Sequence, residues 1–587
     1  MRRIVVVATA VVALLGALSP PASAQAPAPK VTINGLIDAV TVGGKNFNDG
    51  NYARTDDSTW HARNRGVFTI TGEVGKAKGV LALEIDAAWG QTGQKDGTTA
   101  GQSGSNASSN NGVGSTTNVA FTNGGFDSGV DTTGILEIKN LYVEFPAPWI
   151  PFPTVMRLGA QPTQVTMKPS VLFTTDYPGV WLSSTLAPWL KLNLTYAQLE
   201  ERVTGMRVGG FPRGDDFVLA PSIDIEPMKG IKIRPLWVWY EIQGNSYALS
   251  RCRILCAGLP NNGGTVTVDQ NRGLAAVPGA SHLGNYRVGS VEDRHYFAVD
   301  AQTNFGPFYF DPTVIYMTSS VDVYRQANTT NAAGTETVVS GLQQATGSRL
   351  TQNIESWVVD LRGGWRAGPL LVEGIFMWSP GDDAQHDSFR TSKVYHAVST
   401  DGAGWAGWAD ILTPGTVDYL TGAASGIGEN TGFGRYGILR AGAKASYALT
   451  PAFTVRAGWN SYWTDTKVDT DAANSSVGAT AVSNLTGLSA PSFGNQPCAG
   501  PGGNEHGNLT SNCSPVNNKR GDDKYIGTEV SVGLSYAFAP GLAFDMVYAH
   551  LFAGSALDST QRLPDNSISK SKGQDADLAA ARVRYQF

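Results

Sequence analysis

Short segments in which apolar and polar residues alternate recur along almost the whole chain, and this repetition constrains the fold more than any other feature. In the segment 525–538, Ile526, Val530 and Phe538 are expected on one face, with Glu529 and Ser531 on the other. Such alternation is typical of a strand with one apolar face. About ten such residues suffice for a tilted strand to cross a bilayer. A single strand of this kind would also suit a soluble sandwich, so the connections must decide.

Two kinds of connection separate these segments. The short ones, rich in Pro and Gly, lie at 75–79, 146–153, 184–189, 226–230, 305–308, 366–369, 449–452 and 537–541. The long ones, rich in Gly, Ser, Asn and Thr, lie at 91–133, 243–292, 320–352, 380–433 and 465–523. Soluble domains rarely carry several loops longer than about 15 residues, whereas bacterial transmembrane barrels pair short periplasmic turns with long extracellular loops. We therefore predict an all-β, transmembrane antiparallel β-barrel.

The number of hairpins sets the number of strands. One hairpin for each short connection, together with a first strand at 31–42 and a last strand at 575–587, predicts about 18 strands. The hairpin around 184–189 has the weakest pattern, because the segment 176–183 alternates poorly. Without that hairpin the barrel would have about 16 strands, which is also an even number. A closed barrel is expected because lipid offers no partner to an unpaired strand edge.

The N-terminus has the pattern of a secretory signal. Two arginines precede an apolar run at 4–18, and the small residues Ala22-Ser23-Ala24 follow a proline break. This pattern predicts a cleaved signal peptide at 1–24. We expect a short periplasmic segment at 25–30 and a single barrel domain at 31–587, which leaves no room for a plug domain.

The four cysteines fall in two pairs within loop-like stretches: Cys252 with Cys256, and Cys498 with Cys513. Export to an oxidising compartment makes two loop disulfides the first expectation. Cross-pairing and metal binding stay open as alternatives. No His-rich spacing accompanies either pair, so no metal site and no cofactor are predicted.

Composition and motifs exclude several function classes. The formal net charge of −5 shows no basic excess, so nucleic acid is not an expected partner. The sequence has no Gly-x-Ser-x-Gly, no His-Glu-x-x-His and no phosphate-binding loop motif, so no enzymatic activity is expected. The polar cluster at 382–387 is interpreted as a solvated loop.

If the apolar face of each strand points outward, the other face carries basic and acidic residues in near balance. The predicted pore-lining residues are Arg63, Arg65, Glu84, Asp86, Arg157, Lys232, Arg234, Asp300, Asp311, Asp360, Arg362, Glu373, Arg440, Lys444 and Arg456. Charges are costly to bury in a dry core. Their regular placement therefore indicates either water in a wide barrel or dense pairing.

Two local features need an explanation. Glu137 and Lys139 share the expected face of Leu141, so that strand end either lies above the membrane or contains a bulge. Around the turn 449–452, antiparallel pairing places Lys444 opposite Arg456 or one pair away. Opposed like charges destabilise by up to about 1 kcal/mol, so water, an acidic loop residue or a bound anion should compensate.

The C-terminal segment resembles the last strand of Gram-negative outer-membrane proteins. Ala579, Ala581, Val583, Tyr585 and Phe587 alternate on one face and end in an aromatic residue. The resemblance implies that Tyr585 and Phe587 form a signal read by the barrel-assembly machinery. We expect deletion of Phe587 to lower the yield of assembled protein.

Two further segments resemble Gram-negative porins: Asn140-Leu141-Tyr142-Val143-Glu144-Phe145 and Arg157-Leu158-Gly159-Ala160-Gln161. In related porins a second Arg often precedes the Gln, and Ala160 stands there instead. The resemblance implies that the loop 163–175, which holds Lys168, folds into the pore as a constriction. The loop 380–433, with Trp405 and Trp408, is the alternative, and deletion of only one of the two loops is expected to raise conductance.

The resemblance implies an outer-membrane porin for passive diffusion of small hydrophilic solutes and ions. The implied partners are outer-membrane lipid and lipopolysaccharide, the barrel-assembly machinery and two further copies of the chain in a homotrimer. Two alternatives stay open. One is a substrate-specific porin for an anion, carboxylate or sugar, and the other is a structural or adhesive surface barrel.

Overall fold

The protein was analysed as a computed structural model. It describes residues 28–46, 58–89, 136–168, 172–200, 207–208, 211–212, 216–242, 286–287, 292–325, 329–330, 336–337, 349–382, 391–398, 407–413, 436–468, 523–562 and 568–587. Within these ranges no helix has the length and apolar character needed to cross a membrane.

Long antiparallel strands form one sheet. Without the two-residue strands β12 and β19, this sheet has 18 strands. They are β1 Lys30–Lys45, β2 Ser58–Val74, β3 Ala77–Ala88, β4 Leu136–Pro146, β5 Thr154–Gln164, β6 Thr174–Ala187, β7 Leu190–Glu200, β10 Asp216–Met228, β11 Ile231–Ile242, β13 Glu292–Phe305, β14 Phe308–Arg325, β17 Arg349–Ala367, β18 Leu370–Ser379, β20 Ile438–Thr450, β21 Phe453–Val468, β22 Asp523–Ala539, β23 Leu542–Ala553 and β26 Ala576–Gln586.

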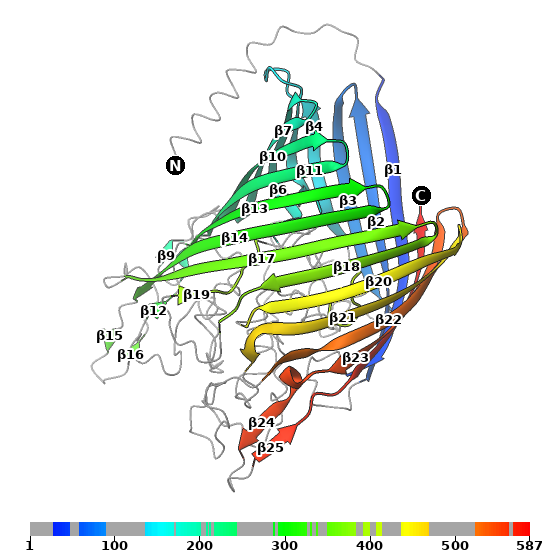
Figure 1. Ribbon diagram of the computed structural model, residues 1–587. Helices are drawn as coiled ribbons and strands as arrows, with labels where there is room; N and C mark the ends of the chain where they lie inside the picture. Colours follow the sequence, from blue (N-terminus) through cyan, green and yellow to red (C-terminus); the bar gives the residue numbers. More distant parts are fainter. Residues whose placement is uncertain are drawn as a thin grey trace.

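Several short elements are not counted among these 18 long strands. They are β8 Arg207–Val208, β9 Phe211–Pro212, β12 Tyr286–Arg287, β15 Thr329–Thr330, β16 Glu336–Thr337, β19 Thr391–Ser392, β24 Ser559–Arg562, β25 Ile568–Ser571 and the 3-10 turn η3 Ser555–Leu557. Figure 1 shows the tight turns at one end of the barrel, whereas β12, β15, β16, β24 and β25 lie toward the other end. We call these the turn end and the loop end.

The sheet closes on itself through its first and last strands. In β1, Asp38 pairs with Arg584 of β26, and Gly35 exchanges two backbone hydrogen bonds of 3.0 Å with Phe587. The 18-strand closed barrel predicted from the sequence is confirmed. The hairpin around 184–189 forms as β6 and β7, with a tight turn between Ala187 and Leu190, so the count of 16 is wrong.

Alternation along the strands separates an apolar outer face from an inner face. In β22, Val530 and Val532 are exposed on the outside, whereas Glu529, which precedes Val530, is 1% exposed. The expectation that Ile526 shares the outer face is wrong, because Ile526 is fully buried. A register shift between Tyr462 and Trp463 on the neighbouring strand leaves Ile526 as an extra residue, and this bulge reverses the alternation.

A second bulge explains the misplaced charge of β4. Ala82 of β3 pairs with Asn140, but the next residue, Leu83, pairs with Ile138, so Lys139 is the extra residue. Its Nζ lies 2.7 Å from an Oε of Glu84 and 3.3 Å from an Oδ of Asp176. Of the two explanations for Lys139, the bulge is therefore correct.

The inner face divides into two belts. Near the turn end the inward side chains are charged or polar, and we call this the ionic tier; it includes Asp224, Arg234, Asp300, Asp311, Asp360, Arg362, Glu373, Lys444, Arg456, Asp545 and Arg582. Toward the loop end the same strands turn apolar residues inward, and we call this the apolar tier; it includes Val218, Val238, Tyr240, Tyr296, Ile315, Met317, Val358, Met377, Ile438 and Tyr462. On β14, for example, the change occurs between Thr313 and Ile315.

Candidate functional site

Ion pairs between neighbouring strands dominate the ionic tier. Arg584 binds Asp38 through both of its forked nitrogens, and Arg234 binds Asp224 in the same way, at 2.5 and 2.9 Å. Further pairs between strands join Arg65 to Glu84, Arg157 and Lys78 to Glu144, and Arg582 to Asp545, whereas Arg362 pairs with Asp360 on its own strand, β17. The inward charges were expected to be compensated either by water or by dense pairing, and the wall of the described strands shows dense pairing.

The expected clash between Lys444 and Arg456 is reduced by the register. Arg456 pairs with Ser446 and Lys444 with Gly458, so the two cations are one pair away from each other. The Nζ of Lys444 lies 3.4 Å from Glu373 on the adjacent β18 and 4.3 Å from the ring centroid of Trp408. A wall carboxylate and an aromatic ring compensate Lys444, so its position does not require a bound anion.

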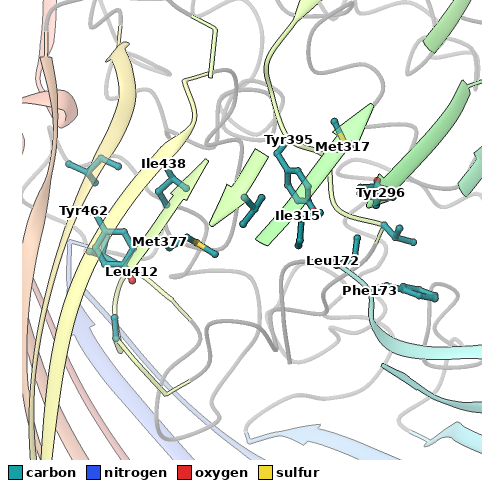
Figure 2. Packing of buried hydrophobic residues seen from close by; sticks show 14 of the residues in the cluster. Leu172, Phe173, Tyr296, Ile315, Met317, Met377, Tyr395, Leu412, Ile438 and Tyr462 are labelled. Atoms are coloured by element: carbon teal, nitrogen blue, oxygen red, sulfur yellow. The ribbon is translucent and has the colours of Figure 1, made fainter. Parts of the chain in front are cut away.

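The described segments of both candidate constriction loops lie inside the barrel. Residues 165–168 and 172–173 follow β5, and residues 391–398 and 407–413 belong to the long connection after β18. Val398 N donates a 2.9 Å hydrogen bond to the carbonyl oxygen of Leu172, so the two loops contact each other. Figure 2 shows Leu172, Phe173, Tyr395 and Leu412 among the inward apolar side chains of the wall.

The loop after β5 is attached to the ionic tier. Met167 N donates to Asp300 at 2.6 Å, and Arg234 donates to the carbonyl oxygen of Val165 at 3.2 Å. Lys168 donates from Nζ to the carbonyl oxygen of Asp311. Burial lowers the pKa of the Lys168 amine, although Asp360, Asp300 and Asp311 act in the opposite direction. The constriction candidate Lys168 thus lies against the acidic residues of β13, β14 and β17.

The segment 391–398 runs beside the inner face of β17. Tyr296 donates a 2.6 Å hydrogen bond to the carbonyl oxygen of His396, and the Tyr296 and Tyr395 rings meet edge to face at 6.1 Å. Ser356 donates to the carbonyl oxygen of Lys393 at 2.7 Å. Because Tyr395 and Val398 are buried, this segment fills part of the apolar tier.

A cavity of about 330 Å³ lies between the loop after β5 and the wall of β6, β7, β10, β11 and β13. Its lining combines charged, amide and hydroxyl side chains with one indole: Gln164, Trp181, Asn193, Ser222, Asp224, Lys232, Arg234 and Gln302. Lys232 is exposed, and it forms no ion pair with any residue that the structure describes. Because Arg234 is paired with Asp224, the net positive charge of this cavity comes from Lys232.

The other predicted pore-lining residues take different positions. Arg63 is buried in β2, and Arg440 is buried in the apolar tier, where it donates to Asn460 at 3.1 Å and lies over the Tyr462 ring. Asp86 belongs to β3, but its side chain lies outside the described part of the structure. The cysteines 252, 256, 498 and 513 and Trp405 also lie outside the described residues.

The sequence did not single out several groups that shape the site. Trp181 lines the cavity and lies under the guanidinium of Arg157, at 5.2 Å. It was missed because the segment 176–183 alternates poorly. The inward packing of Ile411 was also missed, because loop residues carry no periodicity that indicates which side chains turn inward; Trp408 was named only as part of the alternative constriction loop.

The terminal aromatic residues lie on the outer face. Tyr585 and Phe587 are both exposed, and their rings stack at 5.5 Å. The Phe587 ring also lies against Gly35 of β1, where an added Cβ would come within 2.8 Å of the ring. The last residue of the chain therefore takes part in closing the barrel.

Comparisons with known proteins give structural neighbours only. No family model matches the chain, and no curated protein matches it in sequence. Among solved structures, the chain is similar to Pseudomonas aeruginosa OccK9 (OpdG), at 10% identity and a TM-score of 0.43, and to OpdK of the same organism, solved with vanillate, at 8% identity and a TM-score of 0.42. Each alignment covers 95% of this chain and 98% of the other. The fold assignment of this chain rests on its own strand pairing.

Proposed function

We propose that the protein is an outer-membrane porin through which small hydrophilic solutes and ions diffuse passively. The observation that carries this proposal is the contrast between the two faces of one closed barrel. Apolar side chains such as Val532 and Phe310 are exposed on the outside, whereas paired charges line the inside. A lipid environment satisfies the first face and an aqueous lumen the second. No catalytic role is proposed.

Within this proposal the ionic tier, together with Asp86, lines the pore, and the inward loops constrict it. The cavity beside Lys232 lies next to the constriction candidate after β5. Its amide and hydroxyl groups offer hydrogen bonds to a passing solute. The indole of Trp181 offers an apolar surface for the body of such a solute.

The direct test is conductance of the purified protein in planar bilayers. Stable open-channel steps with a linear dependence on salt concentration are expected. Closed membranes at every protein concentration would contradict the proposal and favour a structural or adhesive barrel.

A second candidate function is a porin with a preference for anionic solutes. It is favoured by Lys232, whose exposed ammonium faces a cavity in which the neighbouring Arg234 and Asp224 neutralise each other. Liposome swelling with matched neutral and carboxylate-bearing solutes tests it. Faster entry of the carboxylates supports the preference, and equal rates return the protein to the general type.

The proposed partners follow from the same fold. We propose that the barrel-assembly machinery recognises the last strand, that lipid and lipopolysaccharide surround the outer face, and that the chain forms a homotrimer. Deletion of Phe587 removes two backbone hydrogen bonds and the ring that packs on Gly35. We expect a lower yield of folded protein in outer-membrane fractions, and an unchanged yield would contradict a role in assembly.

A further inference from the structure

A compact turn occupies the lumen opposite the loop after β5. In the segment 407–413 the side chains from Trp408 to Thr413 are buried, although none of these residues belongs to a strand. The Thr413 hydroxyl closes the turn, since it donates to the carbonyl oxygen of Ala409 at 3.1 Å and accepts from Ala409 N at 3.2 Å. These two hydrogen bonds lie within the turn, so its attachment to the wall comes from other contacts.

One carboxylate of the wall is bonded to the backbone of this turn. Glu529 lies on the inner face of β22 and accepts three successive backbone N–H groups, from Asp410 at 2.5 Å, Ile411 at 3.1 Å and Leu412 at 3.0 Å. The three donors share the two oxygens of one side chain, so this single residue holds three consecutive backbone groups. The Glu529 carboxylate and the N–H groups of residues 410–412 are buried, so neither side has water as an alternative hydrogen-bond partner.

The start of the turn has two further attachments. Asn460 donates from its side chain to the carbonyl oxygen of Trp408, and Lys444 lies over the Trp408 ring. Both groups also have partners on the wall, since Asn460 accepts from Arg440 and Lys444 pairs with Glu373. These two groups could keep their wall partners if the turn moved away, but Glu529 would lose all three of its backbone donors.

We propose that Glu529 is the positioning residue that holds residues 407–413 across the lumen as a fixed constriction. The role as a constriction rests on the proposed channel function, whereas the anchoring itself does not. Glu529→Ala removes every acceptor and leaves three buried N–H groups without a partner. Glu529→Gln keeps one acceptor oxygen but turns an NH₂ group toward backbone donors.

The position of the turn can be measured independently of conductance. Ala409 is fully buried, so Ala409→Cys places a small thiol in the turn without adding much volume. Modification by a charged thiol reagent, above that of the protein without this substitution, reports release of the turn. We expect slow modification with Glu529 present, fast modification with Glu529→Ala and an intermediate rate with Glu529→Gln.

Conductance then tests the constriction. Glu529→Ala is expected to raise the single-channel conductance to that of a variant lacking 407–413, and Glu529→Gln part of the way. Glu144→Gln is the matched control, because its carboxylate binds Lys78 and Arg157 on the wall, and it should leave the thiol introduced at position 409 protected. If Glu529→Ala does not fold, judged by heat-modifiable gel migration, Glu529→Gln alone decides.

Each outcome separates the anchor from the channel. An unmodified thiol at position 409 in folded Glu529→Ala and Glu529→Gln proteins would overturn the anchor, whatever the conductance. A released turn with unchanged conductance would overturn its role as a constriction. A parent protein that forms no channel would overturn the proposed function, while the thiol rates would still test the anchor.

Discussion

The ionic tier and the apolar tier are built from the same strands, yet they solve opposite problems. Near the turn end, the side chains of Arg234, Asp224 and Lys232 border a cavity. There the charge of Arg234 is neutralised by Asp224 on the neighbouring strand. Near the loop end, Ile315, Met317 and other apolar residues are fully buried, because chain segments from two loops cover them. A barrel interior can thus be polar or core-like, depending on what fills it.

Under the proposed channel function, the two tiers should contribute differently to solute passage and to stability. Some charged groups near the turn end, such as Lys232 and Lys78, retain exposure, so changes to them should act mainly on ion selectivity. The apolar tier behaves like a protein core, in which an unmatched charge or a lost segment costs free energy of unfolding.

Removal of the loops that cover the apolar tier should have the largest effect. We expect deletion of 391–413 to raise single-channel conductance strongly, and deletion of 165–173 to raise it as well, because Val398 and Leu172 join the two loops. Planar-bilayer recordings of both variants measure this. A rise for only one variant would match the expectation from sequence and show that the contact between the loops has no consequence for the pore.

The second prediction compares one ion pair from each tier. Arg294 and Glu292 pair within the apolar tier at 0% and 1% side-chain exposure, whereas Lys78 and Glu144 pair at 34% and 17%. Arg294→Met leaves a buried carboxylate uncompensated and should cost about 3–5 kcal/mol. Lys78→Met should cost at most about 1 kcal/mol. Urea unfolding in detergent measures both, and equal losses would break the distinction between the tiers.

The third prediction concerns selectivity. Lys232→Glu reverses an exposed charge in the cavity and should shift the zero-current potential in a salt gradient toward cations. Lys444→Ser should shift it less, because Lys444 is covered by Trp408 and paired with Glu373. Lys229→Glu, in the turn before β11, is the control with the same change of charge outside the cavity. A shift equal to that control would remove Lys232 from the selectivity-determining residues.

The smallest effect is expected from pH. Burial lowers the pKa of Lys168, so this amine loses its proton at a lower pH than an exposed lysine. As the pH rises through that lowered pKa, the pore loses one positive charge beside Asp300, Asp311 and Asp360. The zero-current potential should therefore move toward cations in alkaline buffer. The Lys168→Met protein should lack this step, and an identical pH profile in both proteins would contradict the assignment.

Much of the barrel was predictable because lipid imposes simple rules on strands. The eight tight turns lie where Pro and Gly cluster between alternating segments, and they fix the number of strands. Local bulges were harder. Ile526 turns inward because it is the extra residue of a bulge. The adjacent Gly527 has a φ of 154°, and an added Cβ there would come within 2.6 Å of the Phe552 carbonyl oxygen. Such an irregularity depends on the neighbouring strand and not on the local period.

Residues close together along the chain were enough to predict the strand periodicity, the turns and the apolar outer face, but not the inward position of Lys139 at a bulge. Only the tertiary structure decided which charges meet, such as Lys139 with Asp176 and Lys444 with Glu373. It also decided that two loops enter the lumen and that Glu529 holds one of them. The physical reason is that loop segments have no period, so their positions are set by hydrogen bonds and packing against strands far away in the chain.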